Sequence, residues 1–323
     1  MKEKLNQLKK IFQKDDKLLI IINPDPDSIA SALALKRLCK SWISTVTIAQ
    51  TRETRRLENK MMQKLLRIKL ASLSKIDKEE YTKTAIVDGQ PDFFSQFSIP
   101  HIHIIIDHHP AKEDYPAEFK DIQPQCGATS TIMYEYLEYA GIKPSPVLAT
   151  SMCYGIKTDT ENFERNTIRR DAIAFGKLFA YAQPEVLTNI EKWNIPKECI
   201  PVFRKALHDF NIKRDVISVF LGEIKISDYA VMVADFLKTF EGILLCVVIA
   251  KYNNQLLIIL RSFGIKYNVG RLSSETFGTI GSAGGHRTMA RVEIDMGKMD
   301  ELSELPEDKY LEEFIVKELI KKR

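Results

Sequence analysis

Short apolar runs rich in β-branched residues alternate with amphipathic segments through the first half of the chain. The runs with the length and composition of strands buried on both faces are 18–22, 46–49, 84–87 and 102–106. Segments with helical spacing of apolar positions stand between or beside them, at 4–14, 29–38, 132–139 and 146–156. Strands that alternate with helices predict an α/β domain built on a doubly wound parallel sheet.

The pattern changes in the second half. From about residue 184 to 214 the chain is helical and charged, with isolated prolines and no strand pattern. Strand-like runs then follow at 216–221, 229–233, 242–251 and 256–261, and the chain ends in a charged amphipathic helix at 310–323. Asn253-Asn254 predicts a hairpin turn between the last two strands. Hairpins in place of strand–helix–strand units predict a second domain of the α+β class.

Three parts follow from these patterns. We predict an N-terminal α/β domain over residues 1–185, a helical connector over 186–214, and a smaller α+β domain over 215–323. A length of 323 residues is long for one domain and suits two.

The composition is that of an ordinary globular protein, with 45% apolar and 28% charged residues and a net charge of +4. Five scattered cysteines without CxxC spacing indicate reduced thiols, and they argue against disulfides or a zinc site. The N-terminus has no apolar segment typical of a signal peptide, and no apolar run approaches the roughly 18–20 residues of a membrane span. We therefore expect a cytoplasmic protein with no membrane partner.

Residues that can bind metals or move protons follow the predicted strands. The buried run 104–106 leads directly into Asp107-His108-His109, and Pro110 prevents the strand from continuing. Acidic residues in comparable positions are Asp25 and Asp27 after the first strand, Asp88 after the third, and Asp159 after the helix that ends near Ile156. The carboxyl ends of parallel strands meet at one edge of a sheet, so these side chains should lie together, with Asp25 and Asp27 on one side of an extended turn.

So many acids and imidazoles at one edge need a compensating cation. Carboxylates with imidazoles suit Mn²⁺, Mg²⁺ or Fe²⁺ better than a metal that prefers thiolates. Two such ions about 3.5–4 Å apart would clamp a phosphoryl group for in-line displacement. Each acid taken alone is also compatible with a helix cap or a turn, most readily Asp25 and Asp159.

Six segments, in order, resemble the motifs of one protein family. They are Asn-Pro-Asp-Pro-Asp-Ser-Ile-Ala-Ser (23–31), Val-Asp (87–88), Asp-His-His (107–109), Gly-Ala-Thr-Ser-Thr (127–131), Gly-Ile-Lys-Thr-Asp-Thr (155–160) and Gly-Gly-His (284–286). The family is the DHH phosphoesterases that carry a DHHA1 C-terminal domain. The chain is most similar to the branch of nano-RNases and pAp or cyclic-dinucleotide phosphodiesterases, and more distantly to RecJ-like exonucleases.

The resemblance implies two Mn²⁺ ions, with Mg²⁺ as the alternative. Asp25 would bind one ion, Asp27, His108 and Asp159 would bind the other, and Asp88 would bridge them. Asp88, His108 and His109 would form the catalytic group, and Asp107 and Asn23 would orient its members. His109 would face the substrate phosphate. The second domain would bind the terminal nucleotide through Arg261, Ser262, Gly284, Gly285 and His286.

The chain departs from the family pattern at four positions. Ile21 stands where the family usually has a metal-binding histidine, so the ion shared by Asp25 and Asp88 should be the weaker one. Pro26 replaces a common glycine, and Ala283 and Arg291 stand where glycines are more usual. The segment 23–28 also resembles the opening motif of family II inorganic pyrophosphatases.

The sequence thus predicts a metal-dependent phosphodiesterase or phosphatase. Its substrates would be short nucleotides (nano-RNA, linear or cyclic dinucleotides, or pAp), held in a cleft between two domains. One alternative is a degenerate DHH protein that binds nucleotides for regulation with little turnover. Another is an activity like that of inorganic pyrophosphatases or exopolyphosphatases. The expected partner is an oligonucleotide or nucleotide substrate, and a homodimer is compatible with the sequence.

Overall fold

The computed structural model describes residues 1–54, 57–97, 99, 101–111, 114–164, 166–191, 195–299 and 308–321. The chain forms two compact units, Met1–Trp193 and Asn194–Arg323. The boundary falls inside the predicted connector 186–214. Helix α7 (Pro184–Glu191), which begins just before the connector, lies in the first unit, and α8 (Ile200–Asp209) lies in the second. The structure therefore divides the connector between the two units.

The N-terminal unit is built on a six-stranded sheet in which every pairing is parallel. The strand order is β3-β2-β1-β4-β5-β6, the order of a doubly wound α/β sheet. The strands are β1 (Lys17–Ile22), β2 (Thr45–Gln50), β3 (Ala71–Ser72), β4 (Lys83–Val87), β5 (Ile104–Asp107) and β6 (Phe119–Ile122). The predicted fold class is confirmed, and the four strands expected in this half are all present.

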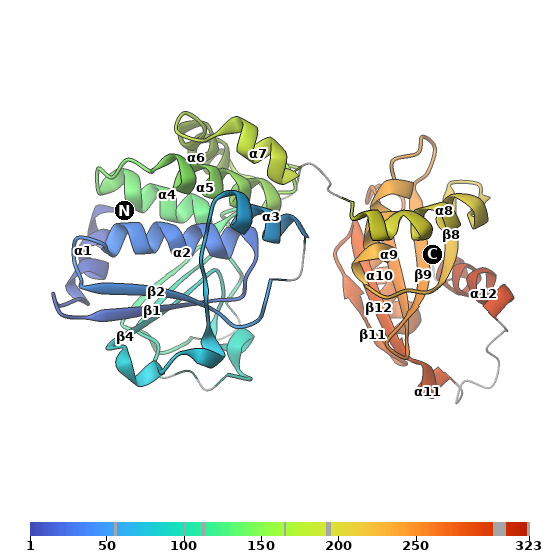
Figure 1. The fold of residues 1–323 in the computed structure, drawn as a ribbon, viewed down its shortest axis with the longest axis horizontal. Helices are drawn as coiled ribbons and strands as arrows, with labels where there is room; N and C mark the ends of the chain where they lie inside the picture. The colour runs from blue at the N-terminus through green and yellow to red at the C-terminus, as the bar shows by residue number, and fades with distance from the viewer. Residues whose placement is uncertain are drawn as a thin grey trace. The chain divides into compact units, whose positions relative to one another are not determined.

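Helices cover one face of this sheet, and Figure 1 shows α2, α4 and α5 packed against one another. The helices of the unit are α1 (Lys2–Lys10), α2 (Pro26–Cys39), α3 (Leu57–Leu65), α4 (Thr129–Tyr139), α5 (Pro146–Asp159), α6 (Arg169–Phe179) and α7. Ile20 and Ile22 of β1 point into the core that these helices share. Leu19 and Ile21 point to the other face, into a smaller apolar cluster with Phe94. Burial on both faces explains why β1 is apolar without alternation.

The second face is covered by short 3₁₀ turns at Leu73–Lys75, Lys78–Glu80 and Pro91–Phe94. None of the helices in the described part of the chain is long and apolar enough to cross a membrane.

The C-terminal unit contains a second six-stranded sheet in the order β11-β12-β10-β9-β8-β7. Its strands are β7 (Asn211–Lys213), β8 (Val216–Glu223), β9 (Leu245–Tyr252), β10 (Gln255–Ser262), β11 (Ser282–Gly285) and β12 (Met289–Asp295). The predicted turn between β9 and β10 is confirmed, with φ values of 48° at Asn253 and 59° at Asn254.

One predicted strand in this unit is wrong. Residues 229–233 lie in helix α9 (Asp228–Leu237), and the strands on either side of it, β8 and β9, pair in parallel. A parallel pair needs a crossover connection, which α9 supplies. The buried residues of α9 follow helical spacing over its full length: Tyr229, Ala230, Val233, Ala234 and Leu237. The unit thus contains a strand–helix–strand element where hairpins were expected.

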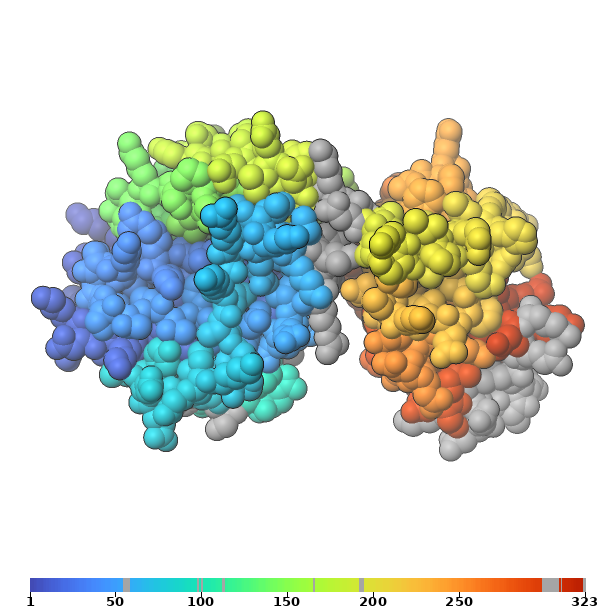
Figure 2. Space-filling model, in the orientation of Figure 1, coloured from blue at the N-terminus to red at the C-terminus, as the bar shows by residue number. Residues whose placement is uncertain are grey.

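The remaining helices of this unit are α10 (Val269–Phe277), α11 (Met296–Met299) and α12 (Asp308–Lys321), with a 3₁₀ turn at Lys197–Cys199 before α8. Helix α8 forms part of the surface of the unit in the space-filling view (Figure 2). The expected C-terminal amphipathic helix is α12, and it packs onto β8 and α10.

Candidate metal-binding site

The candidate site lies at the carboxyl edge of the parallel sheet. Strand β1 occupies the middle, with β2 on one side and β4 on the other, so the strand order reverses between β1 and β4. In open α/β sheets, the loops diverge at this point and leave room for ligands. Asp27 follows β1, Asp88 follows β4, and His108 follows β5. The sheet order therefore brings together three segments that are distant in sequence.

The chain turns into α2 earlier than predicted. Asp25 is the N-cap of α2, and its Oδ1 accepts a hydrogen bond from the backbone N–H of Ser28 at 2.8 Å. Ser28 Oγ in turn accepts from the N–H of Asp25 at 3.0 Å and donates to the main-chain carbonyl of Asn23 at 2.7 Å. Pro26 occupies the first helical position, where its fixed φ is favourable. The expectation of an extended turn that aligns Asp25 with Asp27 is wrong, because Asp27 already lies in the helix.

Asp27 is fully buried and anchors a second helix. Its Oδ2 accepts from the N–H of Thr129 at 2.6 Å, and its Oδ1 accepts from the N–H of Ser130 at 2.8 Å. These donors belong to the first turn of α4, whose N-cap residue Ala128 has no side chain that could cap it. Asp27 supplies both the missing acceptor and the negative charge that a helix N-terminus favours. Gly155 of α5 permits this packing, because a Cβ atom there would lie 3.0 Å from Asp27.

Asp88 follows β4 in the left-handed region, with φ of 59°. Asp is one of the few residues that tolerates this conformation without a large penalty. Its Oδ1 accepts a hydrogen bond from Thr129 Oγ1 at 2.8 Å, so Thr129 contacts both site acids, one through its backbone and one through its side chain.

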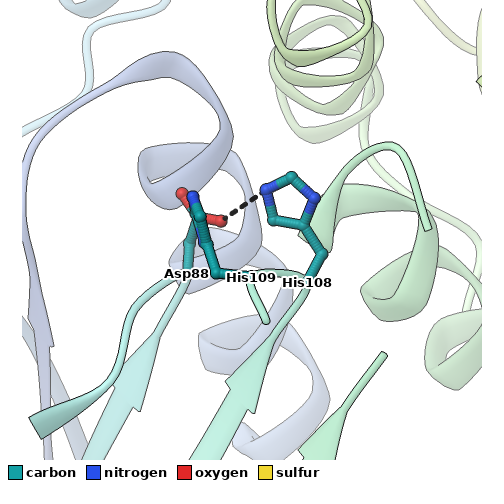
Figure 3. Close-up of side chains that lie close together, drawn as sticks. All are labelled: Asp88, His108 and His109. Carbon is teal, nitrogen blue, oxygen red and sulfur yellow. Dashed lines mark ion pairs between the residues drawn. The ribbon is translucent and has the colours of Figure 1, made fainter. Parts of the chain in front are cut away.

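His108 presents one ring nitrogen to these acids. Its Nδ1 lies 3.2 Å from the carbonyl oxygen of Cys126, which can only accept, so Nδ1 carries a proton. Its Nε2 lies 3.0 Å from Asp159 Oδ2 and 3.6 Å from Asp88 Oδ1, yet it makes no well-aligned hydrogen bond. Figure 3 shows the His108 ring directed at Asp88, with His109 beside it. A histidine that is held through Nδ1 and turns Nε2 toward carboxylates is arranged as a metal ligand.

Asp107 fixes the direction of His109. The carboxylate is fully buried, and its Oδ1 accepts from His109 Nδ1 at 2.8 Å and from the N–H of His108 at 2.8 Å. Gln90 Nε2 donates to Asp107 Oδ2 at 2.7 Å and to the carbonyl of His109 at 3.0 Å. The imidazole of His109 also packs edge-on against Phe93. His109 therefore keeps Nε2 free, and its side chain is 41% exposed.

The charges of the site are not balanced within the chain. Burial, followed by the charge of Asp159, raises the pKa of Asp25 to about 6 and that of Asp27 to about 7. Burial and the neighbouring Asp27 raise the pKa of Asp88 well above its usual range. Burial opposes the charged form of His108, but the carboxylates of Asp159 and Asp27 outweigh it and raise the pKa of His108 to about 9. A divalent cation would stabilise the ionised acids and take the place of the His108 proton.

The residues present fit such an ion. Asp27, Asp88, His108 and Asp159 each offer one ligand atom, and these atoms all lie within 4.8 Å of one another. Three carboxylates and one imidazole are a ligand set for Mn²⁺ or Mg²⁺. Asp88, His108 and His109 form an overlapping group. Asp25 belongs to neither group, so its role at a second ion stays a prediction.

Ile21 lies in the smaller apolar cluster with Ile86 and Phe94, and it is fully buried.

A separate group, His101, His103 and Glu118, suits a metal poorly. The backbone N–H of Thr84 donates to His103 Nδ1 at 3.2 Å, so the proton of the neutral ring is on Nε2, the atom nearest Glu118. The ammonium group of Lys83 also lies 3.1 Å from Glu118.

Two residues that support the site were not expected from the sequence. Gln90 follows Asp88 by two positions and orients Asp107, as described above. Asp171 of α6 is fully buried, and it accepts from the N–H of Gly127 at 3.1 Å and from Thr131 Oγ1. Asp171 thereby holds the segment 127–131 whose N–H groups bind Asp27. The sequence signal for Gln90 was its position two residues after the motif acid Asp88, whereas nothing in the sequence links Asp171 to residue 127.

The substrate residues predicted in the second unit occupy the end of β10 and the strand β11. Arg261 forms an ion pair with Asp235 at 2.5 Å and has a side chain that is 13% exposed. Ser262 is fully buried, and its hydroxyl donates to the carbonyl of Tyr267 at 2.9 Å. In this structure Ser262 shapes the loop after β10, and a contact with substrate stays a prediction.

Gly284 and Gly285 end β11, and His286 follows them with an exposed side chain. Gly285 has a φ of 153°, and a Cβ atom there would lie 2.3 Å from the carbonyl oxygen of Met289. The N–H of His286 donates to the same carbonyl at 2.7 Å, and the carbonyl of His286 accepts from the N–H of Gly270 at 2.8 Å. The backbone here is fixed, and it presents the His286 side chain to solvent.

Comparisons with known proteins place the N-terminal unit in relation to one protein family. Residues 17–156 match the sequence model of the DHH family, N-terminal domain. The chain is 35% identical over 315 residues to an uncharacterized protein of Methanocaldococcus jannaschii, covering 92% of this chain and 65% of that protein. It is 26% identical over 210 residues to the A-adding tRNA nucleotidyltransferase of Aquifex aeolicus, covering 62% of this chain and 24% of that enzyme. The chain therefore spans less than two thirds of the length of these curated relatives.

A solved structure shares the fold over most of the chain. It is an exopolyphosphatase-related protein from Bacteroides fragilis, with a TM-score of 0.72 and 17% sequence identity, covering 94% of this chain and 95% of that one.

Proposed function

We propose that the chain is a metal-dependent phosphoesterase, on the premise that residues 17–156 match the DHH family, N-terminal domain. Its substrates are the phosphate esters of short nucleotides: nano-RNA, linear or cyclic dinucleotides, or pAp. The observation that carries this proposal is the group of Asp27, Asp88, His108 and Asp159, in which His108 Nε2 lies 3.0 Å from Asp159 and 3.6 Å from Asp88 without a well-aligned hydrogen bond.

Asp27, Asp88, His108 and Asp159 would hold the divalent ion, Mn²⁺ or Mg²⁺. When bound, the ion supplies a Lewis acid that polarises a phosphoryl oxygen and favours the ionised form of water near it. The backbone N–H groups of Thr129 and Ser130 hold the Asp27 carboxylate in place, so its geometry does not depend on the ion.

His109 is suited to contact the substrate. Asp107 accepts a hydrogen bond from Nδ1, which leaves Nε2 on the exposed side of the ring. When the ring carries a second proton, Nε2 can donate it to a phosphate oxygen or transfer it to a leaving oxygen. A protonated imidazole offers an anionic ester a charge-assisted hydrogen bond. His109 thus provides binding and proton transfer without acting as a ligand of the four-residue group.

Substitution of a metal ligand tests the proposal. Purified protein is incubated with Mn²⁺ and a panel of dinucleotides, cyclic dinucleotides, pAp and pyrophosphate, and the products are separated by chromatography. Asp88→Asn keeps the size of the side chain but removes its charge, so we expect metal-dependent hydrolysis to fall by at least about 100-fold, as for loss of an essential electrostatic contact. Asp114→Asn is the control, because Asp114 lies in the same unit, is paired with Lys120, and is 91% exposed.

Retention of most of the activity in Asp88→Asn, or an equal loss in Asp114→Asn, would show that Asp88 is not part of the reaction centre.

The C-terminal unit supplies the second test. We propose that the exposed His286 binds a phosphate or the terminal nucleotide. His286→Ala should raise KM about tenfold or more, since a charge-assisted hydrogen bond contributes about 1.5–3 kcal/mol, and metal stoichiometry should be unchanged. The matched control is His208→Ala, a histidine that is 85% exposed in the same unit. A fall in bound metal in His286→Ala would contradict a role in substrate binding.

One observation favours a second candidate, a nucleotide-binding protein with little turnover. Asp25 lies outside the four-residue group, and Ile21 is an apolar residue within the sheet, so a second ion has few ligands here. Calorimetric titration with Mn²⁺ separates the two candidates when it is combined with the substrate panel. One tight ion and nucleotide binding without product would favour the binder, and product formation would favour the enzyme. Hydrolysis of pyrophosphate alone would favour a pyrophosphatase.

A further inference from the structure

A groove of about 370 Å³ lies in the N-terminal unit, away from the candidate metal site. It is formed by the end of α2, the start of β2 and the start of α5. Both helices have 14 residues and reach the metal site with their opposite ends, at Asp27 and Asp159. A helix of that length spans about 20 Å, so the groove is a separate place on the unit.

Its lining combines two kinds of side chain. Leu33, Val46 and Leu148 form an apolar wall, and Lys36, Arg37 and Lys40 supply three positive charges at the rim. No acidic residue lines the groove. Within the described part of the chain, no ion pair joins any of the three cations to an acid. The charge is therefore unbalanced beside an apolar surface that water solvates poorly.

Hydroxyl and backbone groups add polar contacts on the opposite side. Ser145 is the N-cap of α5, and its Oγ accepts from the N–H of Leu148 at 3.3 Å, which leaves the hydroxyl proton available to a ligand. Pro146 begins the helix, and the positive end of the α5 dipole lies at the groove. The positive groups thus come from two elements, α2 and α5, that both line the groove with the apolar wall.

We propose that this groove is a second ligand site that binds an organic phosphate monoester with an apolar body. The apolar wall would take the body of the ligand. The cations would take the phosphate, with the guanidinium of Arg37 matching two phosphate oxygens and the two lysines acting as point charges. Three cations match a doubly negative phosphate better than a singly negative carboxylate. The volume lies within the range of small-molecule sites.

The probe is 1-naphthyl phosphate, titrated by calorimetry into the full chain after removal of divalent ions, so that the metal site does not compete. We expect it to bind at least about tenfold more tightly than 1-naphthol, inorganic phosphate or 1-naphthoate, because each of these lacks one of the features that the groove recognises. Equal binding of 1-naphthoate would refute the assignment to phosphate.

Amino-acid substitutions test whether the probe binds in the groove. The triple variant Lys36→Gln, Arg37→Gln, Lys40→Gln and the single variant Leu33→Trp should each weaken binding at least about tenfold, one by removing charge and the other by filling the apolar half. The matched control is Lys60→Gln, Lys64→Gln, Arg67→Gln, three exposed cations of the same unit that do not line the groove. This control should change affinity less than about twofold.

Two results would overturn the proposal. The first is no detectable binding to the unmutated protein at millimolar probe, in which case the cations at the end of α2 serve only to favour the helix C-terminus. The second is binding that the groove variants and the control weaken equally, which would indicate general attraction to positive charge.

Discussion

Side chains of the Asp-His-His segment are oriented by hydrogen bonds to residues outside that segment, such as Gln90 and Cys126. Asp107 has no free carboxylate oxygen for a metal, because both oxygens accept hydrogen bonds from His108, His109 and Gln90. Its neighbour His108 is held through Nδ1 and presents Nε2 to the acids. Adjacent residues in one Asp-His-His segment therefore have different roles, because the strand ends there and each side chain points in a different direction.

Gln90 is predicted to position His109 through Asp107. Gln90→Met retains length and volume but removes the donor to Asp107 and to the His109 carbonyl, which leaves a buried carboxylate oxygen without a partner. We expect kcat to fall about tenfold and the acidic limb of the pH–rate profile to shift, with metal affinity unchanged.

The control for this prediction is Gln183→Met, a glutamine of the same unit whose backbone N–H, and not its side chain, bonds to Thr150. If Gln90→Met lowers metal affinity as much as kcat, Gln90 supports the ligands and not His109.

At the scale of elements, the start of α4 joins the parts of the site. Its first N–H groups bind Asp27, and the Thr129 hydroxyl binds Asp88. The segment before it is held from the other side by Asp171 of α6, whose Oδ2 also accepts from the N–H of Ile168 at 2.8 Å. Helices α2, α4 and α6 therefore meet through two buried carboxylates, and the position of α4 determines the position of both site acids.

Asp171→Asn is predicted to loosen this junction. The N–H of Gly127 reaches both carboxylate oxygens, and the N–H of Ile168 donates to Oδ2. An amide oxygen at the Oδ2 position keeps both N–H partners, but the NH₂ group then faces the Thr131 hydroxyl and the negative charge is lost. We expect a loss of about 3 kcal/mol in the free energy of unfolding, as for breaking a buried charged network, together with weaker metal binding. Urea denaturation and metal titration measure the two effects.

Thr131→Val is the matched control, because it removes only one partner of Asp171 and should cost about 1 kcal/mol. A change of less than about 0.5 kcal/mol in Asp171→Asn would place it with ordinary surface substitutions and contradict this account.

At the scale of the whole molecule, two units with separate cores carry the predicted metal ligands and the predicted nucleotide contacts. The acids and imidazoles of the candidate metal site all come from the first unit, and the predicted nucleotide contacts come from the second. The first unit buries several like charges at one sheet edge, so its stability must depend on pH and on metal ions.

The metal-free protein is predicted to lose stability as pH rises from 5 to 8.5. The pKa values of Asp25 and Asp27 are raised to about 6 and about 7 in the folded state, so their contribution is fully present below about pH 4 and is lost as pH rises through these values. The pKa of His108 is raised to about 9, so its contribution is lost between about pH 6.5 and 9, in the same direction. Thermal unfolding should show a midpoint several degrees lower at pH 8.5 than at pH 5.

Added Mg²⁺ should reduce this fall, because the ion binds the ionised acids of the folded state. Asp27→Asn removes one of the titrating groups and should flatten the pH dependence, whereas Asp114→Asn should not. A metal-free protein that becomes more stable between pH 5 and 8.5 would show that these carboxyl groups are not buried as described.

The sequence by itself determined the strands of the first unit and the residues that follow them. Runs such as Leu18–Ile22 are apolar at every position because both faces of the sheet are covered, and this pattern is local. The acids after the strands were also identifiable, because parallel strands deliver their ends to a common edge. The strand order, the capping of α4 by Asp27, and the supports from Gln90 and Asp171 were decided only by the tertiary structure. Each joins residues distant in sequence, such as Asp27 and Thr129. The segment 229–233 shows the same limit, since short apolar runs suit a strand or a helix, and the parallel pairing of β8 with β9 decided in favour of the helix.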